Sequence, residues 1–540
     1  MHAMHIVALL VGSLAVSAVA RSRDWPAPLL LVAVGVAVSF VPGVPRIELD
    51  PELLLTVVLP PLLYSAALDS SYLSFRASVR PILSLGVGLV LVTAFAVALV
   101  ASLLMPTLPF AAALVLGAVV APPDAVSAAA IGRKLNLPRR LMTVLSGESL
   151  VNDATALTLY RVGITAVVSA GSSFGLGLRV FALATVVGVV VGLVIGLVVH
   201  AVRVRLSDPT MESVLGLVVP FSAYLLAEEL SGSGVLAVVA AGLYLGHHSP
   251  KAGFSMRLQE QSVWNATDLL LEALVFGLIG LQTRWVIERL PEFGEPTWQL
   301  LLVAGAVLVT VIAVRALWVH LARLLPVRML SSESDARHWP WGSVGVLSWA
   351  GMRGVVTLAA ATGIPFETES GAPFPARGPI QFFAVVVTIG TLLLQGTTLP
   401  WLIRVLHVAD PHEAERDQRA EVAARRATAK AALARLDQVL AKHSAHVPEQ
   451  AAKHIAAQLH ELVELNARAA VDRLELDPDD PKRRKHRAFR RMRQELLAAQ
   501  RAALIDERDS GRLDDEVMRK VLHELDLTEA AVSGTGQRRL

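Results

Sequence analysis

The 540-residue sequence contains no cysteine. That absence excludes disulfide bonds, thiol catalysis and cysteine-ligated metal sites. Charge is scarce as well, because Asp, Glu, Lys and Arg make up 18% of the chain, against about 25% in soluble proteins. The net charge of +3 is too small to indicate a nucleic-acid partner. A phosphate-binding glycine loop is also missing, which argues against an ATP-driven pump.

The charge that is present is distributed unevenly. Residues 411–540 hold 48 of the 95 charged residues, so that the first 410 residues have the composition of a membrane protein. We therefore predict a transmembrane domain over residues 1–410 and a helical tail over residues 411–540. The tail shows no catalytic motif, and we expect it to regulate the protein or support its oligomeric state. Its basic run at 482–493 fits either anionic headgroups or a solvated helix face, and we favour the solvated face.

Apolar runs of about 20 residues, the length that crosses ~30 Å of hydrocarbon, recur along the first domain. Thirteen are predicted, at 4–20, 27–42, 52–68, 81–104, 109–131, 141–168, 176–202, 211–230, 232–247, 262–281, 298–322, 341–365 and 379–405. Fifteen Lys and Arg residues fall in the loops on one side and five on the other. The positive-inside rule then places the N-terminus outside and the tail in the cytoplasm.

Two of these segments contain residues that break a helix. The fifth carries Ala121-Pro122-Pro123-Asp124, and the twelfth carries Gly351-Met352-Arg353-Gly354. Their offset of seven segments fits two inverted six-helix repeats, whose discontinuous helices cross at a binding site near the middle of the bilayer. Ordinary proline kinks are the simpler alternative. We predict an all-α polytopic membrane protein with about 13 transmembrane helices in two inverted repeats.

The sixth segment places carboxylates at membrane depth, in the run from Gly147 to Leu157. A charge there costs about 2.5–3.5 kcal/mol on insertion scales, so such residues usually mark an ion pathway or a proton relay. Burial favours the protonated form of Asp153, whereas a bound cation favours the ionised form. A proton and a small hard cation can therefore compete for this one carboxylate, which is the requirement for an antiporter.

Hard cations prefer oxygen ligands. Ser149 lies one turn before Asp153 on the same helix face, and the break at Pro122-Pro123 frees a backbone carbonyl. Asn152 carries no charge, so one proton per cation is the simplest stoichiometry, and its amide could support Asp153. Asp124 would lie where two half-helices meet, as a partner for exposed N–H groups or in the outer shell of the cation.

Glu148 and Arg353 are one acid and one base in opposite repeats, and we expect them to form a buried ion pair with an architectural role. Arg315 and Glu272 also lie inside apolar runs, where snorkelling or a structural pair explains them as well as a transport role does. The roles of Asp268 and Gln395 stay open.

These motifs resemble the monovalent cation:proton antiporter-1 family, within the sodium/proton exchanger superfamily, in its bacterial form. The matching runs occur in family order within the first 410 residues. They are Leu59-Pro60-Pro61-Leu62-Leu63-Tyr64, Ala121-Pro122-Pro123-Asp124-Ala125-Val126, Gly147-Glu148-Ser149-Leu150-Val151-Asn152-Asp153 and Trp349-Ala350-Gly351-Met352-Arg353-Gly354-Val355-Val356. The third of these runs is the most specific.

The resemblance implies a homodimer in the plasma membrane, with a mobile core in each protomer, that exchanges Na⁺ for H⁺ electroneutrally and serves pH and sodium homeostasis. Li⁺ is often accepted in the family, and K⁺ sometimes. The transported ions are substrates, and no cofactor is implied. Asp153 would be the shared carboxylate, Ser149 and the Pro123 carbonyl its companion ligands, Asn152 a support, and Glu148 with Arg353 the core pair.

Two positions depart from the family pattern. Many relatives have Thr-Asp-Pro where this chain has Pro122-Pro123-Asp124, which removes a hydroxyl ligand. Some have an acid where this chain has Ser65. The choice between Na⁺ and K⁺ therefore stays open.

Two other functions remain as alternatives to the antiporter. A cation channel or uniporter would move cations without obligate proton movement. A membrane sensor would act through the tail.

Overall fold

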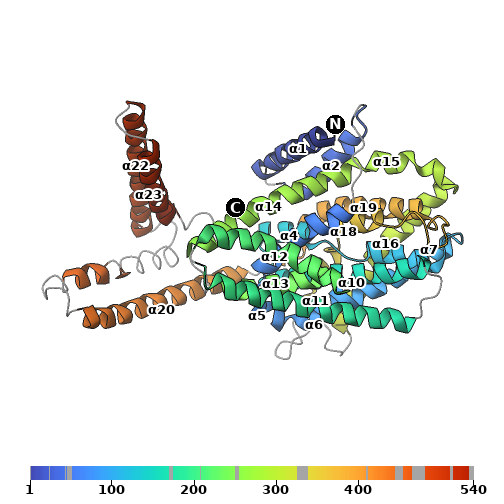
Figure 1. Ribbon diagram of the computed structural model, residues 1–540, viewed down its shortest axis with the longest axis horizontal. Helices are drawn as coiled ribbons and strands as arrows, with labels where there is room; N and C mark the ends of the chain where they lie inside the picture. The colour runs from blue at the N-terminus through green and yellow to red at the C-terminus, as the bar shows by residue number, and fades with distance from the viewer. Residues whose placement is uncertain are drawn as a thin grey trace. The chain divides into compact units, whose positions relative to one another are not determined.

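The computed structural model describes residues 2–23, 25–42, 44, 51–168, 174–206, 208–249, 254–324, 339–408, 411–443, 454–461, 463–464, 481–510 and 515–533. The chain divides into two compact units, Met1–Ala409 and Asp410–Leu540. Within the described ranges the secondary structure is helical, apart from one isolated bridge between Glu367 and Pro373. Figure 1 shows the helices of the first unit.

The helices of the first unit follow the apolar runs. They are α1 (His2–Ser22), α2 (Ala27–Ser39), α3 (Pro51–Leu53), η1 (Leu54–Val58), α4 (Leu59–Asp69), α5 (Tyr72–Ala77), α6 (Val79–Leu83), η2 (Ser84–Leu89), α7 (Val90–Leu104), α8 (Phe110–Val120), α9 (Ala125–Lys134), α10 (Arg139–Val168), α11 (Phe174–Arg203), α12 (Pro209–Glu229), α13 (Gly234–His248), α14 (Phe254–Leu281), α15 (Thr283–Glu288), η4 (Leu290–Phe293), α16 (Thr297–Leu324), α17 (Trp341–Trp349), α18 (Val355–Thr362) and α19 (Arg377–Val405).

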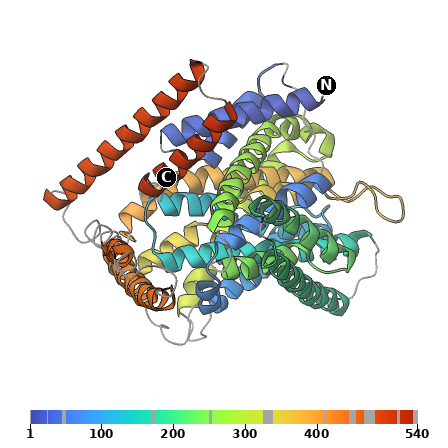
Figure 2. The same cartoon turned by 60° about the vertical axis from the view of Figure 1, so that its left-hand side comes forward.

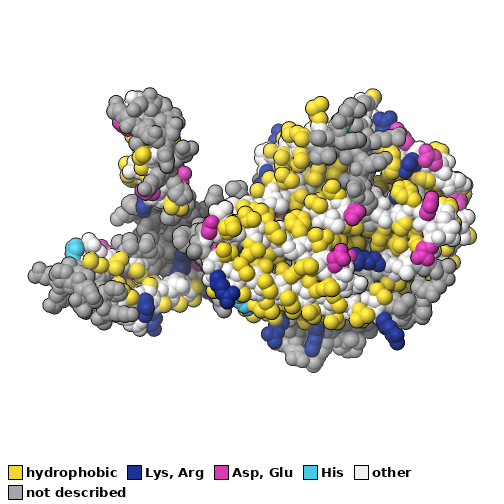
Figure 3. All heavy atoms as spheres, in the orientation of Figure 1, with side chains coloured by type: hydrophobic (Ala, Val, Ile, Leu, Met, Phe, Trp, Pro, Cys, Tyr) yellow, Lys and Arg dark blue, Asp and Glu magenta, His cyan; other side chains and the backbone are white. Residues whose placement is uncertain are grey.

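Among the described residues, six helices are long and apolar enough to cross a membrane. They are Val79–Leu104, Arg179–Arg203, Thr210–Glu229, Gln259–Glu288, Thr297–Leu324 and Arg377–Val405. Apolar side chains cover much of the visible face of this unit (Figure 3), as lipid contact requires. The count of thirteen spans and the inverted repeats stay predictions.

The helices of the first unit pack into one bundle. Helix α8 packs on α7, α10 and α19, and α16 packs on α7 and α19, whereas α2 packs on α14 and α13 packs on α4, α11 and α12. Figures 1 and 2 show this bundle from two directions. Among the half-helices of the interrupted segments, α9 packs on α10, α17 packs on α16 and α19, and α18 packs on α8 and α19.

Each interruption has a local chemical cause. Helix α8 ends at Val120 because Pro122 and Pro123 have no N–H to continue its hydrogen bonds. Helix α9 then begins at Ala125. In the other segment α17 ends at Trp349, and α18 begins after Gly354, whose backbone is not helical (φ −138°, ψ −145°). Both segments are thus split into two half-helices.

The second unit contains α20 (Pro411–His443), α22 (Pro481–Asp509) and α23 (Asp515–Ser533). Helices α22 and α23 pack together, and the Arg501 guanidinium bonds to Asp526 at 2.6 Å and to Glu529. Most side chains of the basic run at 482–493 lie outside the described part, so its role stays a prediction.

Candidate functional site

The two interrupted segments touch at their breaks. The backbone N–H of Asp124 donates to the carbonyl oxygen of Met352 at 2.7 Å. The Arg353 guanidinium donates to the carbonyl of Ala121, and the Arg353 N–H donates to the Thr391 hydroxyl at 2.9 Å. Interrupted backbone is tolerated at membrane depth only where other groups satisfy it. Here the two breaks partly satisfy each other, so they form one crossing.

The Asp124 carboxylate lies against the first turn of α18. A Cβ built on Gly354 would stand only 2.5 Å from Asp124 Oδ2, so the residue that precedes α18 has to be glycine for this approach. Ser127 also donates to Asp124, at 3.4 Å. A carboxylate at a helix N-terminus meets unpaired N–H groups and the positive end of the dipole. The structure thus brings Asp124 to the crossing, as the sequence predicts.

Asp153 lies in the middle of α10, opposite the first break. Its side chain is 7% exposed. Among the residues that the structure describes, none donates a hydrogen bond to its carboxylate or forms an ion pair with it. Asp153 and Asp124 lie close enough for their charges to interact. A buried carboxylate of this kind needs a proton or a cation to offset the cost of its charge.

Asn152, the neighbour of Asp153, ties α10 to the first break. Its Nδ2 donates to the carbonyl oxygen of Pro123 at 2.6 Å, while its Oδ1 is buried without a hydrogen-bond partner in the described part of the chain. The carbonyl that the sequence proposes as a cation ligand is therefore already an acceptor. A carbonyl oxygen has two lone pairs, so Pro123 can still coordinate a cation.

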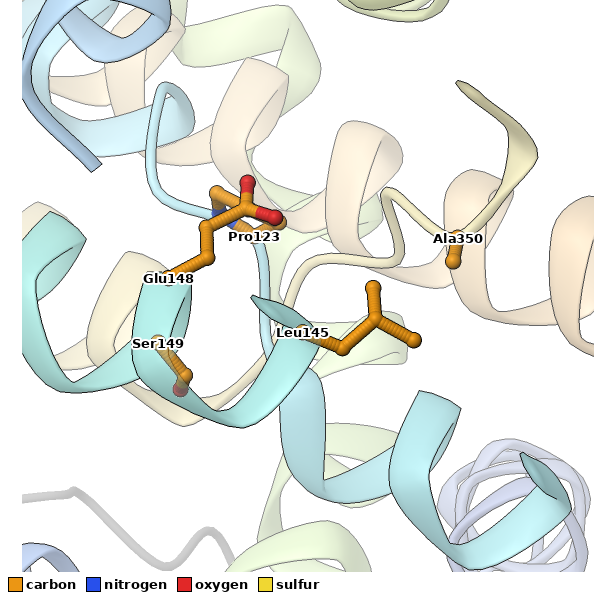
Figure 4. A pocket seen from close by; sticks show the side chains of 5 residues that line it. All are labelled: Pro123, Leu145, Glu148, Ser149 and Ala350. Atoms are coloured by element: carbon orange, nitrogen blue, oxygen red, sulfur yellow. The ribbon is translucent and has the colours of Figure 1, made fainter. Parts of the chain in front are cut away.

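Ser149 lines a small pocket with Pro123, Leu145, Glu148 and Ala350. The pocket is too narrow to admit a water molecule. In Figure 4 the Glu148 carboxylate points toward the non-helical segment that carries Pro123.

The ion pair of Glu148 differs from the sequence expectation. Its two carboxylate oxygens accept from Nη1 and Nη2 of Arg315 at 2.5 and 2.9 Å, and both residues are 1% exposed. Nε of Arg315 donates to the carbonyl of Leu347 at 3.0 Å. This fork-to-fork geometry is the strongest arrangement for an arginine and a carboxylate.

Arg353, the partner expected for Glu148, instead bonds to Ala121. The physical reason is local: α8 ends at Val120, so the carbonyl of its C-cap residue Ala121 has no helical donor, and Arg353 lies in the break that faces it. Arg353 nevertheless lies close enough to Glu148 and Arg315 for electrostatic interaction with both side chains. The partner that the structure shows is Arg315, which lies within the apolar run of α16. From the sequence, a structural ion pair was one of the two explanations for this arginine.

Asp268 of α14 forms a hydrogen bond with a residue that the sequence did not connect to it. Its Oδ1 accepts from the Ser65 hydroxyl at 2.7 Å, across 203 residues of chain. The chain thus brings a carboxylate to Ser65 from a different helix. Nothing in the sequence spacing connects these two residues.

Over the described residues, no cluster of three or more His, Asp or Glu is arranged to hold a metal ion. The oxygens that the sequence proposes as cation ligands belong to Asp153, Ser149, Asn152, Asp124 and the Pro123 carbonyl. Their assignment to a cation site stays a prediction.

Comparison with known proteins shows which family the chain resembles. Residues 6–405 match the family described as sodium/hydrogen exchanger, transmembrane. An uncharacterised Na⁺/H⁺ exchanger of Mycobacterium tuberculosis is 34% identical over 97% of this chain and 95% of its own length. A sodium, potassium, lithium and rubidium/H⁺ antiporter of Bacillus subtilis is 30% identical over 70% of this chain and 58% of its own length.

The fold is similar to that of a solved sodium proton antiporter of Methanocaldococcus jannaschii. The two share 18% sequence identity with a TM-score of 0.59, over 76% of this chain and 100% of the other. With the family match over most of the first unit, these findings lead to one conclusion: the chain belongs to the sodium/hydrogen exchanger family of membrane cation/proton antiporters, which are secondary transporters.

Proposed function

We propose that this chain exchanges Na⁺ for H⁺ electroneutrally across the plasma membrane, through competition of the two ions for Asp153. The observation that carries the proposal is the buried Asp153 carboxylate, which has no partner among the described residues and whose neighbour Asn152 bonds to the first break. A group with these surroundings can take up a proton or a cation in turn.

The chemistry follows from the groups at the crossing. A proton on Asp153 leaves the site neutral, and its release creates a carboxylate that attracts a cation. Ser149, the Pro123 carbonyl and Asn152 Oδ1 then supply neutral oxygens, while Asp124 adds negative potential from the N-terminus of α18. Because one charge replaces another, one H⁺ leaves for each Na⁺ bound.

Several further features belong to this proposal. The chain would act as a homodimer with the N-terminus outside and the tail in the cytoplasm, and would serve pH and sodium homeostasis. Inverted repeats would let the crossing face the two sides alternately. The broad ion range in the name of the Bacillus relative makes Li⁺ and K⁺ the first alternatives to Na⁺.

The test is proton flux in proteoliposomes that hold a preset pH gradient. Na⁺, Li⁺ or K⁺ is added, with and without K⁺-valinomycin to clamp the membrane voltage. We expect Na⁺ to dissipate the gradient at a rate that the clamp does not change. A rate that follows the voltage would contradict electroneutral exchange. Current without proton movement would indicate a channel, and no response from folded protein would favour a sensor.

A further inference from the structure

Helix α19 turns a polar face toward the broken segment α17–α18. The members of this face recur at helical spacing and are Gln381, Thr388, Thr391, Gln395 and Thr398. Gln381 Nε2 donates to the carbonyl of Ala361 at 3.2 Å. The Thr398 hydroxyl accepts from the Trp349 indole N–H at 2.8 Å. Together with the bond from the Arg353 N–H to Thr391, these contacts hold both half-helices against α19.

Gln395 is the exception on this face. Its side chain is 0% exposed, and neither Nε2 nor Oε1 has a hydrogen-bond partner among the described residues. It lies one turn after Thr391, which holds the break. A Cβ built on Gly351 would stand 3.7 Å from Gln395 Nε2 and 2.6 Å from Cδ of Arg315. The Gln395 amide and the Arg315 side chain therefore both lie beside Gly351 of the break.

The break itself also has unmet hydrogen-bonding capacity. Ala350 and Gly351 are buried, and their carbonyl oxygens receive no hydrogen bond from the described residues. A buried polar group without a partner destabilises the fold, because it has given up its hydrogen bonds to water. The Gln395 amide and the carbonyl groups of the break therefore each need a partner.

The chemistry of the amide identifies that partner. Nε2 can only donate and Oε1 can only accept. A cation would satisfy the oxygen alone, and an anion the nitrogen alone. A water molecule both donates and accepts, and buried waters typically make about three hydrogen bonds to groups of this kind.

We propose that Gln395 binds a buried water molecule at the break between α17 and α18, which completes the hydrogen bonding of that break beside Arg315. The proposal uses none of the candidate cation ligands and does not depend on which ion is transported.

The first test is X-ray radiolytic labelling of the purified full-length chain, read by mass spectrometry. Hydroxyl radicals form from bound water and oxidise the side chains next to it. The reporter is Met352, a fully buried residue of the break, and the control is Met105, 3% exposed in the apolar core. We expect Met352 to be oxidised in the wild type and to fall to the level of Met105 in Gln395→Leu.

The second test is the thermal unfolding midpoint of the same variant, because its sign separates the two possibilities. If the amide holds water, leucine strands the break's carbonyls and lowers the midpoint by roughly 2–4 °C. If the amide is truly unpaired, leucine removes a penalty and raises the midpoint. Gln381→Leu, which removes a known bond to Ala361, is the matched control and should lower it.

A higher midpoint for Gln395→Leu would overturn the proposal. Met352 oxidation that is absent from the wild type, or unchanged by the substitution, would overturn it as well. Neither measurement involves transport, so a failure here is distinct from a failure of the proposed ion exchange.

Discussion

Asp153 and Glu148 lie five residues apart on α10, yet the two carboxylates have opposite surroundings. Glu148 is held by a bidentate arginine, which fixes its charge and position. Asp153 is left without a charged or hydrogen-bonding partner in the described part of the chain, although it is almost as deeply buried. The surroundings of Glu148 suit a permanent structural charge. The surroundings of Asp153 suit a carboxylate that is charged in one state and protonated in another.

Replacing Asp153 with Asn should abolish exchange without preventing folding. The amide keeps the size of the side chain but can hold neither a transferable proton nor a cation's compensating charge. The measurement is proton flux in proteoliposomes, with gel filtration to show intact protein. Glu229→Gln is the matched control, because Glu229 is an exposed carboxylate on α12, and it should transport normally. Retained exchange in Asp153→Asn would remove this residue from the mechanism.

Competition at Asp153 also predicts the direction of the pH response. Acidification protonates the carboxylate and lowers the fraction of sites able to bind Na⁺. The apparent KM for Na⁺ should therefore rise by roughly tenfold for each unit of pH below the titration of the site. The rate at saturating Na⁺ should change much less. Initial rates measured over a grid of Na⁺ concentrations and pH values would show this, and a KM that is independent of pH would contradict competition.

The Glu148–Arg315 pair should contribute to folding rather than to ion choice. Removing one partner strands a buried charge, so Arg315→Met should cost about 3–5 kcal/mol, whereas Glu148→Leu combined with Arg315→Met should recover much of it. Thermal unfolding midpoints of the single and double variants measure this. Arg284→Met breaks a half-exposed pair with Glu288 and should cost less than about 1 kcal/mol. A double variant no more stable than the single one would contradict a structural pair.

At the scale of elements, the crossing depends on how closely two half-helices approach. Prolines stop α8 and glycines separate α17 from α18, but the breaks are tolerated because each satisfies part of the other's backbone. The sequence alone locates both breaks, since proline and glycine act locally. It cannot show that Asp124 meets Met352 and Gly354, because these residues are more than 200 positions apart.

Gly354→Ala is the sharpest test of that approach. The new methyl group would overlap the Asp124 side chain, so the crossing would have to open. We expect at least a tenfold loss of exchange and a lower unfolding midpoint. Gly305→Ala is the matched control on α16, because nothing lies within 4 Å of its added Cβ. It should be neutral or stabilising by up to about 1 kcal/mol. Equal behaviour of the two variants would refute a tight crossing at Gly354.

At the scale of the whole molecule, the chain forms two compact units, and the family match covers only the first. All residues of the crossing lie in that unit. The tail offers packed helices such as α22 and α23, without a catalytic motif. Its absence should therefore leave ion exchange intact.

Truncation after residue 410 should retain measurable Na⁺-driven proton flux, with changes confined to regulation or dimer stability. Flux in proteoliposomes and the elution volume of the purified protein test this directly. The full-length chain, reconstituted at equal density, is the control. Complete loss of flux in a truncated protein that elutes as a folded species would favour the sensor interpretation over the antiporter.

The sequence by itself determined the class of protein and supplied the candidate residues of its site. Hydropathy, helix breakers and a costly buried acid act over a few residues, so the apolar helices, the two breaks and Asp153 could be read directly. Tertiary structure decided the partners: Arg315 rather than Arg353 for Glu148, Asp268 for Ser65, and Asn152 for Pro123. The partner of a buried acid depends on which side chains meet it in the folded chain. From the sequence, more than one buried arginine has the charge needed to pair with Glu148. Only the packing of α10, α16 and the two breaks selects among them.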